Sequence, residues 1–345
     1  MPGAGLGFVN NGSVILRDDI GSVLDPYREV LSRNGFIAGR IAPIMPVQKQ
    51  AGEFLKKPIA AFLKRIDTRR MEDGTLRRIH VSIASGTYFV RPYGIEYPVD
   101  EWNHAVYASD WDMILDGVEE MRDAMARDHE IAVAELVQQE DQYLEDDWRH
   151  LVAKIPWNNP QASILDDVEH LRQRNERRMI PPNVMICSDR VYRQFTRNHQ
   201  ILARINSEGA GTQSLPGQIL RSQLCDLFHV DEILVGKGIY DDDNETTADA
   251  KVDLPTLKRI WKDENVLFGR VVPAGQRPSL RIPSYAYTLQ WRRGPGGRGT
   301  QIDQYLEPQR QGWVIRARTN YEIQVFGNMT YSMIKNTFDP TLAYN

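Results

Sequence analysis

Glycines at residues 294–299 form the pattern closest to a cofactor site. The segment Gly294-Pro-Gly296-Gly-Arg-Gly299 matches the G-x-G-x-x-G fingerprint of dinucleotide-binding proteins. In those proteins the glycine turn leads directly into a helix, whose N-terminus meets the pyrophosphate. Here Pro295 interrupts the motif, Thr300-Gln-Ile-Asp303 follows it, and no βαβ unit surrounds it. We therefore predict a mobile surface loop at this place and no nucleotide cofactor.

Metal ligands and nucleophiles are also poorly placed. The acidic run Asp241-Asp-Asp-Asn-Glu245 offers oxygen ligands, but it lacks the spacing, the central glycine and the distal glutamate of a calcium loop. The seven histidines include no pair at the i, i+4 spacing of a helical metal site. Cys187 would need a histidine beside it to act as a nucleophile, and no serine-centred nucleophile elbow occurs. We therefore predict that the protein is not an enzyme and has no metal and no cofactor.

Charge, in contrast, is strongly segregated between two neighbouring segments. Residues 48–92 carry ten basic and four acidic side chains, a net charge of +6, whereas residues 100–147 carry sixteen acidic and two basic side chains, a net charge of −14. Such segregation favours ion pairing between surfaces, which one subunit cannot satisfy locally. The candidate interface residues on the basic side are Lys64, Arg65, Arg69, Arg70, Arg77 and Arg78. Those on the acidic side are Asp112, Asp116, Glu119, Glu120 and Asp123.

Two different elements are expected to carry these charges. Asp73-Gly74 lies between Lys64–Met71 and the alternating run Thr75–Ile83, which predicts a β-hairpin. The hairpin has few large apolar residues, so it is either a surface flap or a projection onto a neighbouring subunit. The acidic segment predicts a helix over 109–147, begun by a capping box of Ser109 and Asp112. Gly117 costs this helix about 1 kcal/mol relative to alanine and marks a predicted flex point.

The rest of the chain mixes helices and strands, which predicts an α+β fold. Ser163 and Asp166 form a capping box at the start of one helix. Further helices are expected over 189–205 and 218–228. Strands are expected over 184–187, 232–235, 266–272, 285–291, 313–318 and 321–326.

Composition sets outer limits on the function. The chain has 345 residues, of which 26% are charged and 41% hydrophobic, so it is a folded protein too large for one compact core. A net charge of −4 argues against a dedicated nucleic-acid binder. The sequence has no long apolar run and no secretory signal, so we expect no membrane association and assembly in the cytoplasm. Two cysteines cannot form a disulfide framework.

A series of short motifs between residues 154 and 291 resembles a known family. The motifs are Trp157-Asn-Asn-Pro160, Asp166-Asp167, Pro182-Asn-Val-Met-Ile186, Asp189-Arg-Val-Tyr-Arg-Gln-Phe195, Asn198-His-Gln-Ile201, Leu227-Phe-His-Val-Asp-Glu-Ile-Leu-Val-Gly236, Ile260-Trp-Lys-Asp263 and Val266-Leu-Phe268. In this order they resemble the major capsid proteins of tailed bacteriophages, which have the Hong Kong 97-type fold. The order of the arm, basic hairpin and acidic helix along the whole chain fits the same family.

The resemblance implies a division into named segments. Residues 1–35 would form an N-terminal arm, 36–104 the extended β-hairpin loop and its base, and 105–153 a peripheral domain with a long spine helix. Residues 154–304 would form the axial domain. Residues 305–345 would supply C-terminal strands that return to the peripheral and axial domains.

The resemblance also implies partners and a place of action. Copies of the chain would form hexamers and pentamers of an icosahedral virion shell around double-stranded DNA, held without sequence specificity. A portal, a scaffolding protein and a decoration protein would complete the particle. Because no helical charged leader precedes the arm, we expect either a separate scaffolding protein or a leader that has already been lost. Some family members cross-link subunits through lysine and asparagine, for which Lys49, Lys56, Lys57 and Lys64 are candidates by position. The alternatives are an encapsulin-like nanocompartment shell of the same fold, and a soluble α+β enzyme.

Overall fold

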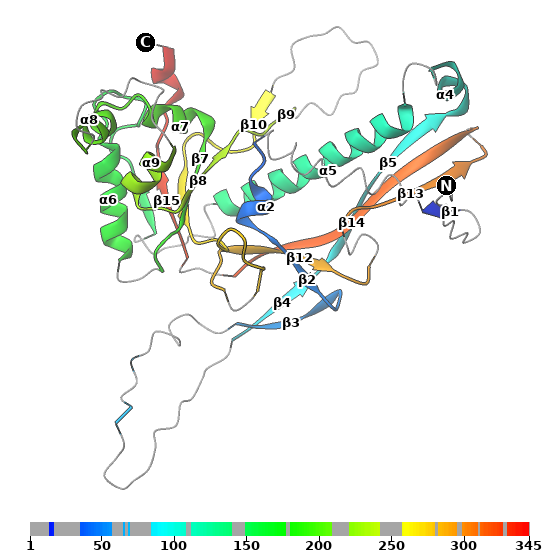
Figure 1. The fold of residues 1–345 in the computed structure, drawn as a ribbon, viewed down its shortest axis with the longest axis horizontal. Helices are drawn as coiled ribbons and strands as arrows, with labels where there is room; N and C mark the ends of the chain where they lie inside the picture. The colour runs from blue at the N-terminus through cyan, green and yellow to red at the C-terminus, as the bar shows by residue number, and fades with distance from the viewer. Residues whose placement is uncertain are drawn as a thin grey trace, which may run out of the picture.

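The protein forms two main β-sheets joined by one long helix, so the expected α+β class is confirmed (Figure 1). The computed structural model describes residues 14–16, 35–56, 65, 68–69, 84–107, 112–139, 149–176, 180–208, 221–241, 257–279, 282–294, 299–309, 311–326 and 330–344. None of the helices in these ranges is long and apolar enough to cross a membrane.

The first sheet is built around β14, a strand of 14 residues. Its order is β1 (Val14–Leu16), β13 (Gln301–Glu307), β14 (Gly312–Val325), β12 (Ala286–Trp291) and β2 (Ile44–Val47), with β5 (Arg91–Asp100) also paired to β14. The predicted break between two strands at 318–321 is wrong, because Thr319 and Asn320 pair with β5. The Asn320 side chain accepts a hydrogen bond from the Trp291 N–H, so this polar residue is satisfied inside the sheet. Strand β13 was not predicted.

The second sheet has helices packed around it. Its strand order is β6 (His150–Val152), β15 (Tyr331–Lys335), β11 (Val266–Gly269), β7 (Val184–Ser188) and β8 (Glu232–Gly236). The helices are α6 (Ile164–Asn175), α7 (Asp189–Phe195), α8 (His199–Glu208) and α9 (Arg221–Phe228). Their shared core includes the fully buried side chains of Trp157, Phe195, Phe228 and Phe268. Strand β15 was not predicted.

Two local expectations about this unit are wrong. The single helix expected over 189–205 is two helices, because the Asn198 side chain accepts hydrogen bonds from the N–H groups of Gln200 and Ile201 and so caps α8. Ser163 stands at the start of α6, but its hydroxyl makes no capping bond. It accepts a hydrogen bond from the Gln200 side chain instead, which links α6 to α8.

Helix α5 (Met113–Gln138) is shorter than the helix expected over 109–147. Asp112 begins it, since its carboxylate accepts hydrogen bonds from the N–H groups of Ile114 and Leu115, both at 3.1 Å. At its end the backbone turns extended at Gln139, and the Gln138 side chain accepts a hydrogen bond from the Lys262 N–H. Ser109, the expected cap, and residues 140–148 lie outside the described residues.

Helix α5 contributes to two hydrophobic cores that are separate from the core of the α6–α9 unit. Near its start, Val118 and Met121 pack against β5, β13 and β14. Near its end, Val133, Ala134 and Val137 pack among α2 (Ala38–Ile41) and strands of the second sheet. The helix therefore fixes how the two sheets lie relative to one another (Figure 1).

The remaining elements lie at the margins. Strands β3 (Ala51–Lys56) and β4 (Ala84–Phe89) pair as an antiparallel ribbon, and β9 (Ile239–Asp241) pairs with β10 (Leu257–Arg259). A short helix, α4 (Glu101–Tyr107), follows β5, and the chain ends with a 3₁₀ turn, η2 (Pro340–Tyr344).

Candidate assembly surfaces

The acidic face of α5 lies beside β5. Asp116, Glu119 and Asp123 are half-buried on this helix, and Glu120 is exposed. Burial, followed by the negative charges of Glu120 and Asp116, raises the pKa of the Tyr97 hydroxyl on β5. The structure thus gathers Asp116 and Glu120 around one tyrosine, whereas Asp112 is used to cap the helix.

Gly117 lies at the closest approach between α5 and β5. A Cβ atom at this position would lie 2.4 Å from Cδ1 of Tyr97, inside van der Waals contact. Glycine is therefore required for packing in this conformation, a reason that the sequence alone did not indicate. The role of Gly117 as a flex point stays a prediction.

Glu130, one of the acidic residues of α5, is buried inside the subunit. Glu130 is 1% exposed, and its carboxylate accepts hydrogen bonds from the N–H groups of Ile37 and Ala38, at 2.7–3.0 Å, and from the Trp261 indole, at 2.7 Å. Burial raises the pKa of the Glu130 carboxyl, and these hydrogen bonds oppose that rise. Glu130 therefore satisfies the first N–H groups of α2 and anchors this segment to α5. Sequence reasoning missed this role because the partners lie 93 and 131 positions away.

A second buried acid holds β13 to β14. Asp303 is fully buried, and its Oδ2 accepts hydrogen bonds from the guanidinium groups of Arg316, at 2.5 Å, and Arg318, at 3.0 Å. Beside it, the Tyr305 hydroxyl donates to Glu96 of β5 at 3.2 Å. These side chains join three strands on one face of the first sheet. The available signal was Asp303 on one side of a short turn and the alternating Arg316 and Arg318 on the other.

The base of the predicted basic hairpin is an ordered ribbon. Strand β3 pairs with β4 from Ala51 opposite Phe89 to Lys56 opposite Ala84, so the intervening segment leaves and re-enters at one place. The Phe54 ring lies 4.6 Å from that of Phe326, which fastens the ribbon to the first sheet. Of the candidate interface residues, Arg65 and Arg69 are exposed. Lys64, Arg70, Arg77, Arg78 and the Asp73-Gly74 turn lie outside the described residues.

The motifs considered for catalysis have other structural roles. Gly299 lies just before strand β13, which begins at Gln301, so the glycine motif lacks the helix that a dinucleotide fingerprint requires. Burial raises the pKa of the Cys187 thiol, which disfavours the reactive thiolate. Within the described residues, no three His, Cys, Asp or Glu side chains group as metal ligands.

Comparison with known proteins gives matches in both sequence and fold. No protein-family model matches the chain. Over 269 residues it is 24% identical to the major capsid protein of Burkholderia phage BcepMu, a match that covers 75% of this chain and 80% of that relative.

Solved structures extend the likeness to nearly the whole fold. A phage-related protein from Bordetella bronchiseptica RB50 matches with a TM-score of 0.63 at 18% identity, covering 91% of this chain and 97% of that one. The capsid of cyanophage P-SCSP1u matches with a TM-score of 0.53 at 9% identity, covering 86% of each chain. The chain is thus a homologue of a phage major capsid protein and has a capsid-protein fold, so its function is structural.

Proposed function

We propose that this chain is the major head protein of a tailed bacteriophage, and that its copies form the hexamers and pentamers of an icosahedral shell around double-stranded DNA. The observation that carries the proposal is the sequence match, which spans four fifths of a major capsid protein. The shape of the subunit supports it, because an elongated sheet with a projecting ribbon offers more surface to neighbours than a compact enzyme does.

We further propose that the subunit is of the Hong Kong 97 type. In this assignment α5 is the spine helix, and the ribbon of β3 and β4 is the base of the extended loop. The proposed segments are the arm (1–35), the loop and its base (36–104), the peripheral domain (105–153), the axial domain (154–304) and the returning strands (305–345). The first sheet would then draw its strands from several segments, since β1, β2, β5, β12 and β14 come from different parts of the chain.

The proposed contact between subunits pairs the basic loop of one copy with the acidic helix of the next. The acidic residues remaining for this contact are Asp116, Glu119, Glu120 and Asp123, since Asp112 caps the helix and Glu130 is buried. Exposed ion pairs contribute only about 0.2–1 kcal/mol each. A head-to-tail contact repeated around a ring adds several such pairs per subunit and closes on itself.

Gly117 has a proposed second role in this assembly. Shells place identical subunits in positions of different curvature, so a helix that bends near its start would let one subunit fit several positions. The packing of Gly117 against Tyr97 means that such a bend would also move β5. Comparing α5 between independent copies in one shell tests this, and coincident helix axes through residues 112–122 would contradict it.

Further proposed partners are a portal, a separate scaffolding protein and a decoration protein, with assembly in the host cytoplasm. Packaged DNA would be held by confinement, since the net charge of −4 provides no basic groove-reading surface. Tight, sequence-dependent binding of a defined duplex by the free chain would contradict this.

Electron microscopy and sedimentation of the purified chain test the proposed function. We expect rings or closed shells of megadalton mass, and a uniform small oligomer under all salt conditions would contradict the proposal. Particles recovered from lysed host cells should protect double-stranded DNA from nuclease. Particles filled with protein and free of DNA would favour the encapsulin-like alternative.

A further inference from the structure

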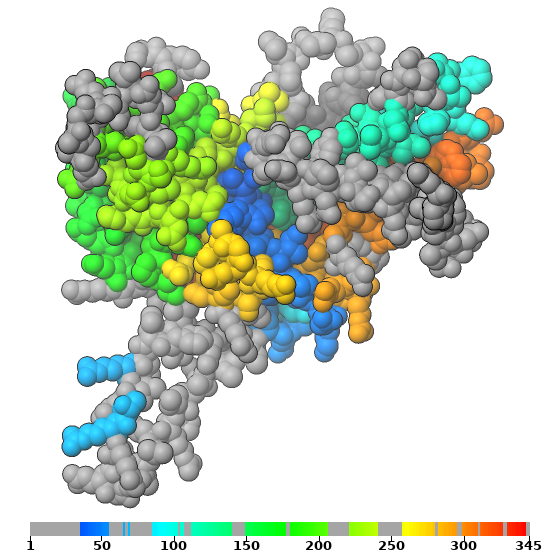
Figure 2. Space-filling model, viewed as in Figure 1, coloured from blue at the N-terminus to red at the C-terminus, as the bar shows by residue number. Residues whose placement is uncertain are grey.

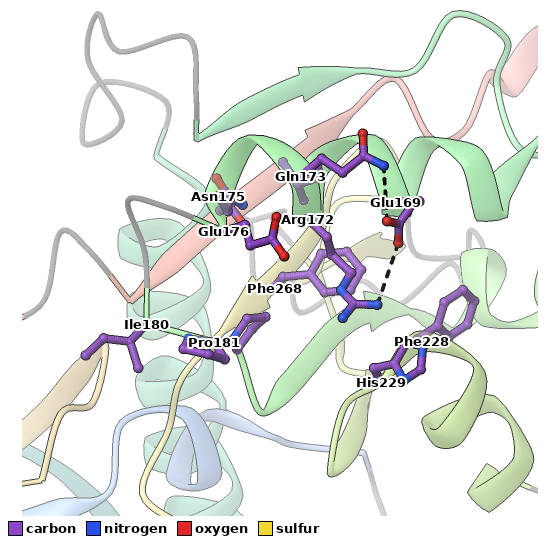
Figure 3. A pocket seen from close by; sticks show the side chains of 13 residues that line it. Glu169, Arg172, Gln173, Asn175, Glu176, Ile180, Pro181, Phe228, His229 and Phe268 are labelled. Atoms are coloured by element: carbon purple, nitrogen blue, oxygen red, sulfur yellow. Dashed lines mark hydrogen bonds and ion pairs between the residues drawn. The ribbon is translucent and has the colours of Figure 1, made fainter.

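The cavity of about 470 Å³ beside α6 offers little to a ligand or a partner (Figure 3). At its rim, Glu169 lies 3.7 Å from the Arg172 guanidinium and accepts a hydrogen bond from Gln173. The rings of Phe228 and Phe268 behind it are buried in the core of the second sheet. The first sheet, in contrast, has an exposed backbone edge that another strand can reach.

That edge belongs to β5, which pairs with β14 over its whole length. Among the described residues, no strand pairs with the other side of β5. The Glu101 N–H, just after β5, donates to the Gln311 carbonyl at 3.2 Å, so the odd-numbered residues of β5 direct their backbone groups toward β14. The even-numbered residues direct theirs to the open side.

The open side is a short and well-defined docking edge. Pro92 and Pro98 have no N–H, so they occupy outward positions without losing a bond to β14, and they limit the stretch that another strand can use. Between them, Gly94 and Glu96 are exposed and each direct one N–H and one C=O outward. Neither N–H has a partner in the described part of the chain. Such an edge is a template for a further strand.

The face of β5 beside this edge sets the chemistry of the strand that fits. Tyr93 and Ile95 are 36% and 38% exposed, and they lie on the same face as Tyr97, which packs against α5. Asp116 and Glu120 of α5 lie close enough to Tyr97 for their charge to act on its hydroxyl. The added strand must therefore carry apolar side chains opposite Tyr93 and Ile95 and a basic one opposite Tyr97.

One stretch of the sequence has this pattern. Residues 75–83, which lie outside the described residues, read Thr-Leu-Arg-Arg-Ile-His-Val-Ser-Ile, and alternation places Arg77, Ile79 and Val81 on one face. An antiparallel register puts Ile79 opposite Ile95. Val81 is then opposite the other exposed apolar residue of the face, and Arg77 is beside the two α5 carboxylates.

This strand cannot come from the same subunit. Strand β4 begins at Ala84 and leads through Val90 directly into β5. The extended chain places Ala84 about 20 Å from Arg91, the first residue of β5. The register above would bring Ile83 opposite Arg91, yet Ile83 is bonded to Ala84. The strand must therefore belong to another copy.

We propose that the outer edge of β5 accepts residues 75–83 of a second copy as an added antiparallel strand. The inference rests on the proposed function, in which the basic loop of one copy meets the acidic helix of the next, and it gives that contact a backbone register. Hydrogen bonds with Gly94 and Glu96 align the two copies. The ion pairs at the surface add only small contributions, and the flanking prolines keep the strand from slipping along the edge.

Cross-linking at this register tests the proposal. In Ile79→Cys/Ile95→Cys the two thiols face each other across a non-hydrogen-bonded pair, where the Cα atoms are about 4.5 Å apart, within the range of a disulfide. Mild oxidation of the assembled full chain should give covalent oligomers on a non-reducing denaturing gel. The control Ser82→Cys/Ile95→Cys turns one thiol to the other face and should give few. Equal cross-linking in the control, no cross-linking, or cross-linked monomers alone overturns the proposal.

A proline substitution tests the backbone bond itself. Glu96→Pro removes one outward N–H, whereas the control Glu96→Ala loses the same side chain, with its bond from Tyr305, and keeps the N–H. Both variants should melt at the same temperature as free chains. The chain concentration for half-maximal ring formation should be about tenfold higher in Glu96→Pro than in Glu96→Ala.

The outcomes separate this contact from the shell function. Equal ring formation by the two variants overturns the added strand and leaves the proposed function standing. An unfolded Glu96→Pro chain also overturns it, because the N–H would then be needed inside the subunit. Absence of rings from the unchanged chain contradicts the proposed function itself.

Discussion

The two sheets of this molecule are stabilised in different ways. The second sheet packs with four helices around one large core, and its buried strands β7 and β11 have no exposed residue. The first sheet is elongated, has a small core under α5, and leaves most of β5 exposed. In Figure 2 the second sheet and its helices form a compact mass, and the first sheet extends away from it. The first sheet therefore leaves surface exposed that the proposed neighbouring copies would cover.

The largest expected effect is on the compact unit. Phe195→Ala removes a fully buried ring that packs against Trp157 and Phe228, and it should lower the free energy of unfolding by about 3–5 kcal/mol. Ile95→Ala, on exposed β5, should cost the free chain less than about 1 kcal/mol. Chemical denaturation of both variants measures this. Equal losses would show that the two units are stabilised alike.

Glu130 tests the connection between the units. In Glu130→Gln the new NH₂ group replaces one acceptor oxygen and faces the Ile37 N–H together with either the Ala38 N–H or the Trp261 indole N–H. We therefore expect a loss of about 1–3 kcal/mol in the free energy of unfolding. The control Glu135→Gln is exposed on the same helix and should change stability by less than about 0.5 kcal/mol. A neutral Glu130→Gln would show that α2 is held by packing alone.

His129, on the helix α5 that joins the two sheets, should make the stability of the chain depend on pH. Burial lowers the pKa of His129 to about 4, and its ring contacts Tyr321 and Thr288. The folded state therefore favours the neutral ring, so stability is complete above about pH 6.5 and falls as the pH drops toward 4, by about 3 kcal/mol. Unfolding measured between pH 7 and 4 should lose this slope in His129→Gln. The exposed His199→Gln should keep it, and an unchanged slope in His129→Gln would contradict the assignment.

Gly117 tests how closely α5 packs against β5 of the first sheet. Gly117→Ala should destabilise the free chain by about 1–2 kcal/mol, because the clash with Tyr97 outweighs the better helix propensity of alanine. In the background Tyr97→Ala the same substitution should become neutral or stabilising. This double-mutant cycle measures the packing contribution directly. A cost that persists without the Tyr97 ring would favour a backbone role instead.

How far the sequence predicts this structure depends on how local the contacts are. Helix α6 and strands β7 and β8 were predicted closely because their apolar patterns are local. Strand β15 was missed because its residues pair with β11, more than sixty positions earlier. The same limit applies to the candidate site, where spacing located the acidic helix but could not show that Glu130 turns inward or that Asp303 meets two arginines.

The central claim is that charge on the first unit drives assembly between copies. Its most direct test is sedimentation velocity of a variant in which Arg69, Arg70, Arg77 and Arg78 are all replaced by glutamate, compared with the unchanged chain at low and high salt. The account predicts that the variant stays a folded monomer, that reversing Glu119, Glu120 and Asp123 to lysine partly restores rings, and that salt weakens assembly of the unchanged chain. Normal ring and shell formation by the quadruple variant at low salt would contradict it.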